Sequence, residues 1–156
     1  MKKVVFISST GGHLTELLQL KELFDEFNAV VITERTKSNW NLSTLLKCPV
    51  YFLVYGTKQH LFSYLFKFIF NWFKSLFLFL KIKPDVVVTT GTHTAVPLCF
   101  IAHFFRKKVI WIETFANSKT PTKAGKMIYP IADKFIVQWE SMLEVYPKAE
   151  VGGWIF

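Results

Sequence analysis

Cysteine is scarce in this chain of 156 residues, which contains two. Cys48 and Cys99 show no metal-ligand spacing and form no disulfide framework. So few thiols are typical of a protein from a reducing, cytoplasmic compartment. We interpret both cysteines as small core residues, and we expect neither a metal site nor a catalytic thiol.

Acidic residues are also few, since 11 Asp and Glu stand against 19 Lys and Arg, for a formal net charge of +8. A basic balance favours anionic partners such as nucleic acid, anionic lipid or phosphate groups. The longest basic run, residues 106–108, is too short for a nucleic-acid-binding stripe. Basic residues placed beside aromatic ones are instead typical of a membrane surface.

Two nucleotide-binding motifs are missing from the sequence. The glycine-containing residues 8–13 (SSTGGH) do not match G-x-G-x-x-G, which disfavours an enzyme that uses a nicotinamide dinucleotide. They also lack the G-K-[ST] ending of a P-loop, which disfavours a P-loop nucleotidase. We therefore expect no bound cofactor.

Aromatic residues, by contrast, are abundant, with 17 Phe and 5 Trp in a chain that is 51% hydrophobic. The length suits a single domain, residues 1–156. The aromatic surplus indicates a surface that meets lipid or another protein, and an aromatic-rich core is the alternative. The first apolar run, residues 4–7, is too short for a signal peptide and is predicted to be a buried strand.

Strand and helix patterns alternate along the chain. Short β-branched runs predict strands at residues 4–7, 29–33, 50–54, 86–90, 109–112 and 135–137. Apolar spacing predicts a helix over residues 14–27, and another at 94–105 with Pro97 in its first turn. A short helix or loop is expected at residues 40–46. This alternation predicts an α/β fold, a Rossmann-like parallel sheet with right-handed crossovers.

The loop after the first strand is a candidate ligand site. Gly11 and Gly12 let the backbone approach a ligand, and free N–H groups at the start of the helix favour phosphate. His13 is placed to act as a base near neutral pH, and Glu16 is placed to orient it or to cap the helix. The alternative is a plain strand-to-helix turn.

The loop after the fourth strand repeats this arrangement in residues 89–94 (TTGTHT). Thr90, Gly91 and Thr92 supply hydroxyl and N–H groups that are good donors to sugar or diphosphate oxygens. The alternative is that the hydroxyl groups cap the following helix, with Thr94 as its N-cap.

A third polar loop follows the fifth strand. Glu113 is expected at the same edge of the sheet, where it would bind a sugar hydroxyl, orient His13 or pair with a nearby lysine. Lys123 and Lys126 are candidates to neutralise a diphosphate, although a solvated face is the commoner fate of lysines. Three donor-rich loops at one sheet edge together predict a ligand site.

The segment at about residues 60–81 is the most distinctive, and residues 61–80 read LFSYLFKFIFNWFKSLFLFL. A membrane span needs about 20 mostly apolar residues, and the two charges inside this segment make spanning costly. The polar positions form one narrow helical stripe: Ser63, Lys67, Asn71, Lys74 and Lys81. We expect an amphipathic helix on a membrane surface, with these residues in contact with lipid: Phe66, Phe70, Trp72, Phe73, Lys67 and Lys74. A core helix with extended lysines is the alternative.

The sequence ends in an apolar group, Trp154, Ile155 and Phe156, whereas terminal segments are usually polar and frayed. Two interpretations stay open, that these side chains tuck into the domain or that they bind a partner.

Four segments together resemble a known family: SSTGGHLTELLQL, TTGTHTAVPLC, IETFANSKTPTKAGKMIYPIADKFIVQWE and GGWIF. They resemble the capsule and exopolysaccharide proteins of the PssD type, relatives of the membrane-anchoring subunit of the eukaryotic dolichol-linked N-acetylglucosaminyltransferase. Both are similar to the N-terminal half of the peptidoglycan N-acetylglucosaminyltransferase MurG. The likeness covers essentially the whole chain, but residues 8–10 are Ser-Ser-Thr where MurG-type sequences have more glycine.

The resemblance implies half of a two-domain GT-B glycosyltransferase. This chain would be the N-terminal, acceptor-binding half, and a separate chain would hold the UDP-sugar. The acceptor would be a polyprenyl-diphosphate sugar at the cytoplasmic face of a bacterial plasma membrane, in capsule or exopolysaccharide synthesis. The transferred sugar would be galactose or N-acetylglucosamine, and little activity is expected without the partner.

The resemblance also carries over individual residues. Gly11, Gly12 and His13 match the acceptor loop of the family, Thr90, Gly91 and Thr92 match its second loop, and Glu113 matches its third. His13 or Glu113 would then help to deprotonate the acceptor hydroxyl. The alternative function is that of a non-catalytic membrane anchor that enhances a separate glycosyltransferase chain.

Overall fold

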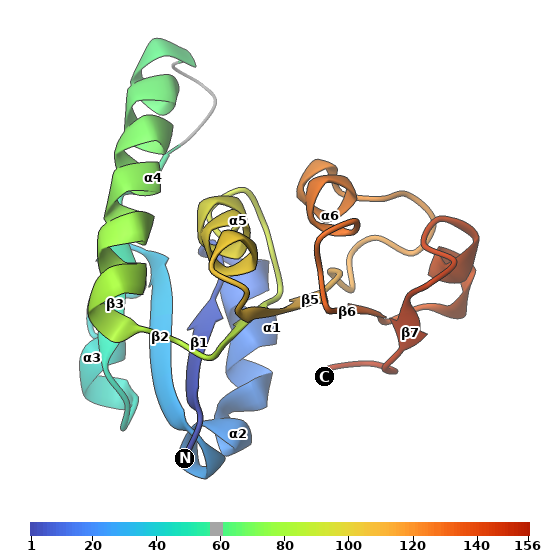
Figure 1. The fold of residues 1–156 in the computed structure, drawn as a ribbon, viewed down its shortest axis with the longest axis horizontal. Coiled ribbons are helices and arrows are strands. Elements are labelled where there is room, and N and C mark those ends of the chain that lie inside the picture. The colour runs from blue at the N-terminus through green and yellow to red at the C-terminus, as the bar shows by residue number, and fades with distance from the viewer. Residues whose placement is uncertain (57–60) are drawn as a thin grey trace.

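The computed structural model describes residues 1–56 and 61–156 (Figure 1). Its sheet has the strand order β3-β2-β1-β4-β5-β6-β7, and every neighbouring pair is parallel. The strands are β1 (Lys3–Ile7), β2 (Asn28–Glu34), β3 (Val50–Leu53), β4 (Val86–Thr89), β5 (Lys108–Ile112), β6 (Lys134–Val137) and β7 (Glu150–Val151). The predicted α/β fold and all six predicted strands are confirmed. β7 consists of two exposed residues, which carry no pattern from which to predict a strand.

The order of the strands reverses at β1, which lies between β2 and β4. Phe6 pairs with Val31 on one side and with Val88 on the other. In a doubly wound sheet a ligand binds in the crevice beyond the carboxyl ends of the strands at such a reversal. The loops that follow β1 and β4 are therefore the first place to look for a site.

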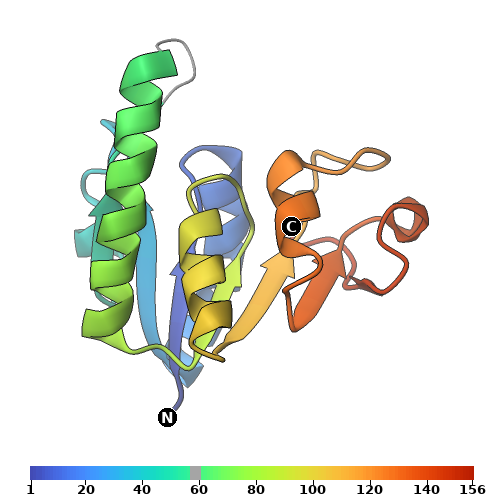
Figure 2. The ribbon, with the colours of Figure 1, turned by 45° about the horizontal axis from the view of Figure 1, so that its top comes forward.

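Helices cover both faces of the sheet (Figure 2). They are α1 (Gly12–Gln19), α2 (Leu23–Glu26), α3 (Leu42–Leu45), α4 (Leu61–Ile82), α5 (Val96–Phe104) and α6 (Lys123–Ile128), with 3-10 turns at Leu20–Glu22 and Glu140–Glu144. Val4 and Phe6 of β1 pack against the side of α1 and α2. Val5 and Ile7 pack against the side of α4 and α5, because side chains alternate along a strand.

Two helix predictions need correction. The helix expected over residues 14–27 is interrupted by the 3-10 turn at Leu20–Glu22. The helix expected from residue 94 begins at Val96, and its N-cap is Ala95 without a side-chain hydrogen bond. Thr94 does not cap this helix, because its hydroxyl donates to Oε1 of Glu34 at 2.8 Å. Pro97 does lie in the first turn, as predicted.

Helix α4 has 22 residues and begins at Leu61, while His60, the predicted first residue, lies outside the described residues. The predicted polar stripe does not face solvent as one strip. Asn71 is buried, and its amide binds both backbone groups of Val54, at 3.0 and 2.8 Å. Within the part of the chain that the structure describes, no helix is long and apolar enough to cross a membrane.

Candidate functional site

The loops after β1 and β4 lie side by side at the carboxyl edge of the sheet. The backbone N–H of Ser9 donates to the carbonyl of Gly91 at 3.0 Å. The hydroxyl of Thr90 donates to the carbonyl of His13 at 2.7 Å. Gly91 has a φ of 94°, a left-handed conformation that glycine adopts without strain. These bonds fix the start of α1 against the second loop.

His13 is held by the backbone of the second loop. Its Nδ1 lies 2.8 Å from the carbonyl oxygen of Thr90. A carbonyl oxygen only accepts, so this bond assigns the proton of the neutral imidazole to Nδ1. Nε2 then carries the free lone pair, which is the form of histidine that can accept a proton from a substrate.

The first turn of α1 is open to a ligand. Gly11 is its N-cap, with a φ of 76° and no side-chain cap. Gly11 and Gly12 are exposed, and a Cβ added at either position would meet no atom within 4 Å. The free N–H groups of this turn and the positive end of the helix dipole suit phosphate or sugar oxygens.

The two threonines of the second loop differ in what they leave free. Thr90 is buried, and both its hydroxyl and its carbonyl bind His13. Thr92 is half-buried, with Oγ1 at 3.4 Å from the hydroxyl of Ser9 and 3.2 Å from Nδ1 of His93. Thr90 therefore positions His13, and Thr92 keeps a hydroxyl at the surface of the loop.

Glu34 and His93 join the site without having been predicted from the sequence. Glu34 ends β2, is buried, and accepts hydrogen bonds from the hydroxyl of Thr94 and the N–H of Thr10. Nε2 of His93 lies 3.6 Å from Oε1 of Glu34. The one available signal was a carboxylate directly after the apolar run of β2, at the same sheet edge as the two loops.

Glu113 is buried and holds the third loop. Its Oε2 accepts from Nε1 of Trp111 at 2.7 Å, and its Oε1 accepts from the N–H of Thr122 at 2.8 Å. A Cβ atom added at Gly125 would clash with Oε2 of Glu113, so the carboxylate occupies space that only a glycine at this position leaves open. Both oxygens are thus occupied by protein donors.

Glu16 does not orient His13 and does not cap α1. Its Oε1 accepts from the hydroxyl of Thr114 at 2.8 Å and from the N–H of Phe115 at 3.0 Å. Its Oε2 is buried and has no hydrogen-bond partner among the described residues. Burial raises the pKa of Glu16 above its ordinary value. This carboxyl group joins α1 to the loop after β5.

Lys123 is exposed at the first residue of α6. Thr122 caps that helix, since its hydroxyl accepts from the N–H of Gly125 at 2.9 Å. Among residues 1–56 and 61–156, no hydrogen bond or ion pair joins Lys123 to the first two loops. The structure therefore brings the first two loops together at His13, and the third loop reaches them through Glu16.

Comparison with known proteins identifies the family. The sequence matches the family described as "Oligosaccharide biosynthesis protein Alg14 like" over residues 3–155. The chain belongs to the Alg14-like family. It is 30% identical to the mouse UDP-N-acetylglucosamine transferase subunit ALG14, over 94% of this chain and 80% of the mouse protein. It is 27% identical to the Debaryomyces hansenii ALG14 subunit, over 96% of this chain and 74% of that protein.

Solved structures with the same fold are longer than the Alg14-like chain. MurG from Acinetobacter baumannii superposes with a TM-score of 0.73 at 17% identity, over 90% of this chain and 43% of that enzyme. UDP-N-acetylglucosamine 2-epimerase from Rickettsia bellii superposes with a TM-score of 0.73 at 18% identity, over 94% of this chain and 41% of that protein. This chain thus spans less than half of either protein. The predicted fold, the N-terminal half of a GT-B enzyme, is confirmed.

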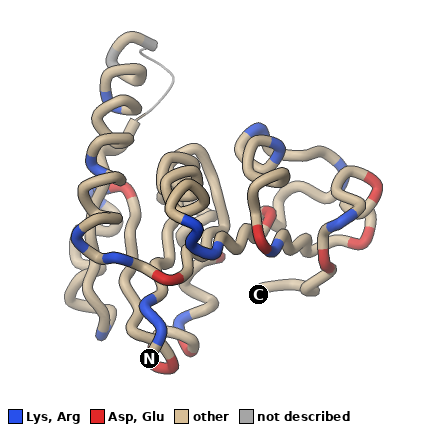
Figure 3. The backbone as a smooth tube through the Cα atoms, viewed as in Figure 1, with Lys and Arg blue, Asp and Glu red and all other residues tan. Residues whose placement is uncertain are grey.

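Helix α4 of the Alg14-like chain turns an apolar face to solvent. Phe66, Phe70 and Phe73 are 72%, 55% and 69% exposed. Lys67 is exposed, and Nζ of Lys74 lies 6.0 Å from the ring centroid of Phe70, so cations lie beside these rings. Figure 3 shows basic positions spaced along α4. Its other large exposed side chains are Phe62, Leu65, Ile69, Leu76, Phe77 and Leu80.

Trp72 lies on a different side of α4 from these residues. It is half-buried, and its ring stacks on Phe100 of α5 with 6.3 Å between centroids. Trp72 therefore packs the helix against the domain.

The C-terminal residues of the Alg14-like chain lie on the domain but keep aromatic surface exposed. Ile155 is half-buried, and its N–H donates to Oε1 of Gln138 at 3.0 Å. Trp154 and Phe156 contact the ring of Phe115, yet each is 64% exposed. A neighbouring apolar hollow of about 310 Å³ is lined by Leu20, Ile112, Ile136, Gln138, Gly152, Gly153, Trp154 and Ile155.

Proposed function

We propose that this chain is the acceptor-binding, membrane-associating subunit of a two-component glycosyltransferase. The complex would add a sugar from a UDP-sugar to a polyprenyl-diphosphate-linked sugar. Family membership supports this, because the mouse relative is named as a subunit of a UDP-N-acetylglucosamine transferase. The observation that carries the proposal is His13, whose Nε2 is left free beside an open glycine loop.

In the proposed reaction the acceptor sugar lies against Gly11, Gly12 and Thr92, with its hydroxyl on Nε2 of His13. As the hydroxyl oxygen bonds to C1 of the donor sugar, the bond from C1 to the phosphate oxygen breaks and UDP leaves with the electron pair. His13 takes the hydroxyl proton and becomes an imidazolium. The carbonyl of Thr90 accepts from Nδ1 before and after this transfer and so keeps the ring in place.

His13 is a better base than Glu113 on geometric grounds. Both carboxylate oxygens of Glu113 accept hydrogen bonds inside the protein, from Trp111 and Thr122. A base must come within hydrogen-bond reach of the proton that it removes. We assign Glu113 to holding the third loop, and Lys123 of that loop is assigned to contact with the acceptor.

The donor sugar is N-acetylglucosamine or galactose in this proposal. N-acetylglucosamine follows the names of the relatives, and galactose follows the resemblance to PssD-type proteins of capsule and exopolysaccharide synthesis. We assign the donor-binding site to a separate chain, because the relatives are named as subunits of a transferase.

The membrane surface is assigned to α4. An exposed face of Phe66, Phe70 and Phe73 suits the boundary between headgroups and acyl chains, with Lys67 and Lys74 placed to reach anionic lipid. The complex would then work at the cytoplasmic face of a bacterial plasma membrane, where the family resemblance places the polyprenyl acceptor.

The partner surface is assigned to the C-terminal residues. Trp154 and Phe156 expose aromatic rings next to an apolar hollow, and aromatic residues are enriched in the cores of interfaces. Ile155 anchors this tail through its bond to Gln138.

A second function deserves the same test, that of a non-catalytic anchor which enhances a separate transferase. The exposed α4 face and tail favour it, because both are binding surfaces that need no chemistry. His13→Ala separates the two functions in the complex of this chain with its donor-binding partner. A subunit that supplies the base loses about 10²- to 10⁴-fold in kcat.

The matched control is His103→Ala, an exposed histidine in the last turn of α5. It should leave the transfer rate unchanged. Full activity of the His13→Ala complex would reduce this chain to an anchor.

A further inference from the structure

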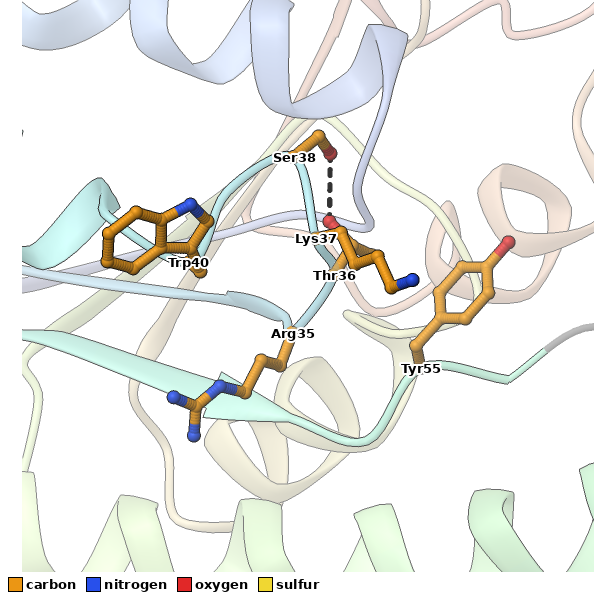
Figure 4. Close-up of a pocket in the computed structure, with 6 residues that line it drawn as sticks. All are labelled: Arg35, Thr36, Lys37, Ser38, Trp40 and Tyr55. Atoms are coloured by element: carbon orange, nitrogen blue, oxygen red, sulfur yellow. Dashed lines mark hydrogen bonds between the residues drawn. The ribbon is translucent and has the colours of Figure 1, made fainter.

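An open hollow lies beyond the carboxyl ends of β2 and β3 (Figure 4). It has a volume of about 970 Å³, in the upper range of small-molecule sites. The residues that line it are Arg35, Thr36, Lys37, Ser38, Trp40 and Tyr55. None of them belongs to the three loops assigned above, so the hollow is a separate feature of the ligand edge.

The loop that forms most of the hollow is fixed by a buried side chain. Nδ2 of Asn39 donates to the carbonyl of Glu34 at 2.8 Å, and its Oδ1 accepts from the N–H of Thr36 at 2.9 Å. The hydroxyls of Thr36 and Ser38 lie 2.9 Å apart (Figure 4). These bonds fix the backbone of the loop and hold its two hydroxyls together, which lowers the entropy cost of ordering the loop around a ligand.

The hollow has two cations and no neutralising carboxylate. Arg35 and Lys37 are exposed, and no carboxylate of residues 1–56 or 61–156 lies within ion-pair distance of either. The adjacent carboxylate of Glu34 is buried and bound to Thr10 and Thr94. Figure 4 shows Arg35 extending away from Lys37, and its guanidinium lies 5.5 Å from the ring centroid of Phe52, so Arg35 would turn toward a ligand that both cations bind. Phosphate is bound well by both arginine and lysine.

Aromatic surface lies beside these cations. Trp40 is 67% exposed and Tyr55 is 42% exposed, and both line the hollow. Figure 4 shows Lys37 extending toward the ring of Tyr55. Large amphipathic rings at a surface suit a ligand whose charged group is joined to an apolar or sugar portion.

The hollow connects the proposed membrane face to the proposed reaction site. The N–H of Thr10, in the first loop, donates to Glu34, the residue before Arg35. On the other side, Gly56 follows Tyr55 of the hollow and lies against α4. A Cβ atom added at Gly56 would lie 3.2 Å from the ring of Tyr64 and 4.0 Å from Cβ of Lys67, both on α4. The first half of α4 rises beyond the carboxyl edge of the sheet (Figure 1).

We infer that this hollow binds the diphosphate of the lipid-linked acceptor, with Arg35 and Lys37 on its phosphate oxygens. The polyprenyl chain then runs back toward α4, and the sugar points toward Gly11, Gly12 and His13. The identity of the acceptor rests on the proposed function. An anionic phospholipid headgroup has related chemistry, so the test must separate the two sources.

The test measures binding of geranyl diphosphate and geranyl monophosphate to the full chain by calorimetry. The variant is Arg35→Gln with Lys37→Gln, and the matched control is Lys148→Gln, an exposed lysine at the opposite edge of the sheet. The loss of one charge-assisted hydrogen bond weakens binding about tenfold, so the double variant should bind the diphosphate about 100-fold more weakly. Its preference for diphosphate over monophosphate should shrink, and Lys148→Gln should bind as the wild type does.

The second arm uses vesicles of phosphatidylcholine and phosphatidylglycerol without acceptor. The double variant should bind them as the wild type does. Weaker vesicle binding with unchanged diphosphate affinity would assign the hollow to a phospholipid headgroup and overturn the inference. Unchanged affinity for both probes would overturn it as well.

The inference and the proposed function fail in different ways. In an active complex, the double variant should raise the KM for acceptor and leave kcat nearly unchanged, and an unchanged KM would contradict the inference alone. If the hollow binds diphosphate but no complex transfers sugar, the proposed function is wrong and the phosphate site stands.

Discussion

His13 and Glu16 lie one turn apart on α1, yet the fold gives them different roles. His13 faces the second loop, where the carbonyl of Thr90 sets its tautomer. Glu16 faces the loop after β5 and is bound by Thr114 and Phe115. At the scale of residues, the carboxyl edge of the sheet therefore has one candidate base, Nε2 of His13, while the carboxylates of Glu16 and Glu113 hold its loops in place.

The raised pKa of Glu16 makes part of the stability depend on pH. Burial makes the folded protein hold this proton more firmly than the unfolded chain does. The stability contributed in this way is complete below the unfolded pKa of about 4.3 and is lost as the pH rises through the folded pKa. Glu16→Gln removes the titration and keeps an oxygen that accepts from Thr114. As the pH rises from 4 to 7, the free energy of unfolding of the variant should therefore increase relative to that of the wild type, as measured by urea unfolding.

The control for this titration is Glu22→Gln, an exposed glutamate in the 3-10 turn after α1. Its stability difference from wild type should stay the same at both pH values. If the free energy of unfolding of Glu16→Gln differs from that of the wild type by the same amount at pH 4 and pH 7, the raised pKa of Glu16 would be contradicted.

The sequence places polar residues at this edge but does not show which of them are buried. Ser8 to His13 and the TTGTHT segment follow strands, so their position could be predicted from alternation alone. The burial of Glu113 depends on Trp111 Nε1 and Thr122 N–H, and on the space that Gly125 leaves. The role of Glu34 depends on Thr94, sixty residues away in the chain. Such long-range hydrogen bonds have no local signal.

At the scale of elements, α4 has two dissimilar sides. On one side, the side-chain amide of Asn71 bonds the backbone N–H and carbonyl of Val54, the residue after β3. Leu78 and Phe79 on this side lie in the core. The other exposes a row of Phe, Leu and Ile side chains. The helical periodicity predicted an amphipathic helix, but it could not show that one residue of the polar stripe, Asn71, is buried. Asn71 satisfies a strand end, so the apolar arc points outward.

The exposed face of α4 should determine membrane binding. Phe66→Ser with Phe73→Ser removes two exposed rings, each of which would contribute about 1.5–3 kcal/mol on burial in lipid. The double variant should bind phosphatidylglycerol vesicles at least about tenfold more weakly in a co-sedimentation assay. Its melting temperature should stay near that of wild type, because both side chains are exposed in the fold.

The matched control is Met127→Ser, which removes an exposed apolar side chain from α6. It should leave vesicle binding unchanged. Equal binding by wild type and the double phenylalanine variant would place the membrane surface elsewhere.

At the scale of the whole molecule, three surfaces are arranged along the sheet. Helix α4 lies at the β3 end, and the ligand edge with His13 lies near the middle of the sheet (Figure 1). The C-terminal tail runs from β7 back past β6 and β5, where Ile155 lines a hollow with Ile136 and Ile112. In the proposed complex the lipid-linked acceptor enters beside α4 and the donor-binding chain sits against Trp154 and Phe156. The mouse relative is named as a subunit of a transferase, and in the proposed complex the partner completes the reaction site.

In the proposed function, this chain and its partner form one enzyme. The direct test is a transfer assay with UDP-N-acetylglucosamine or UDP-galactose and a short polyprenyl-diphosphate sugar, using this chain alone, the partner alone and both together. Holding donor and acceptor in one geometry accelerates a reaction strongly, so the pair should exceed the summed rates of the separate chains by at least about 100-fold. Full activity from the partner alone would contradict the account.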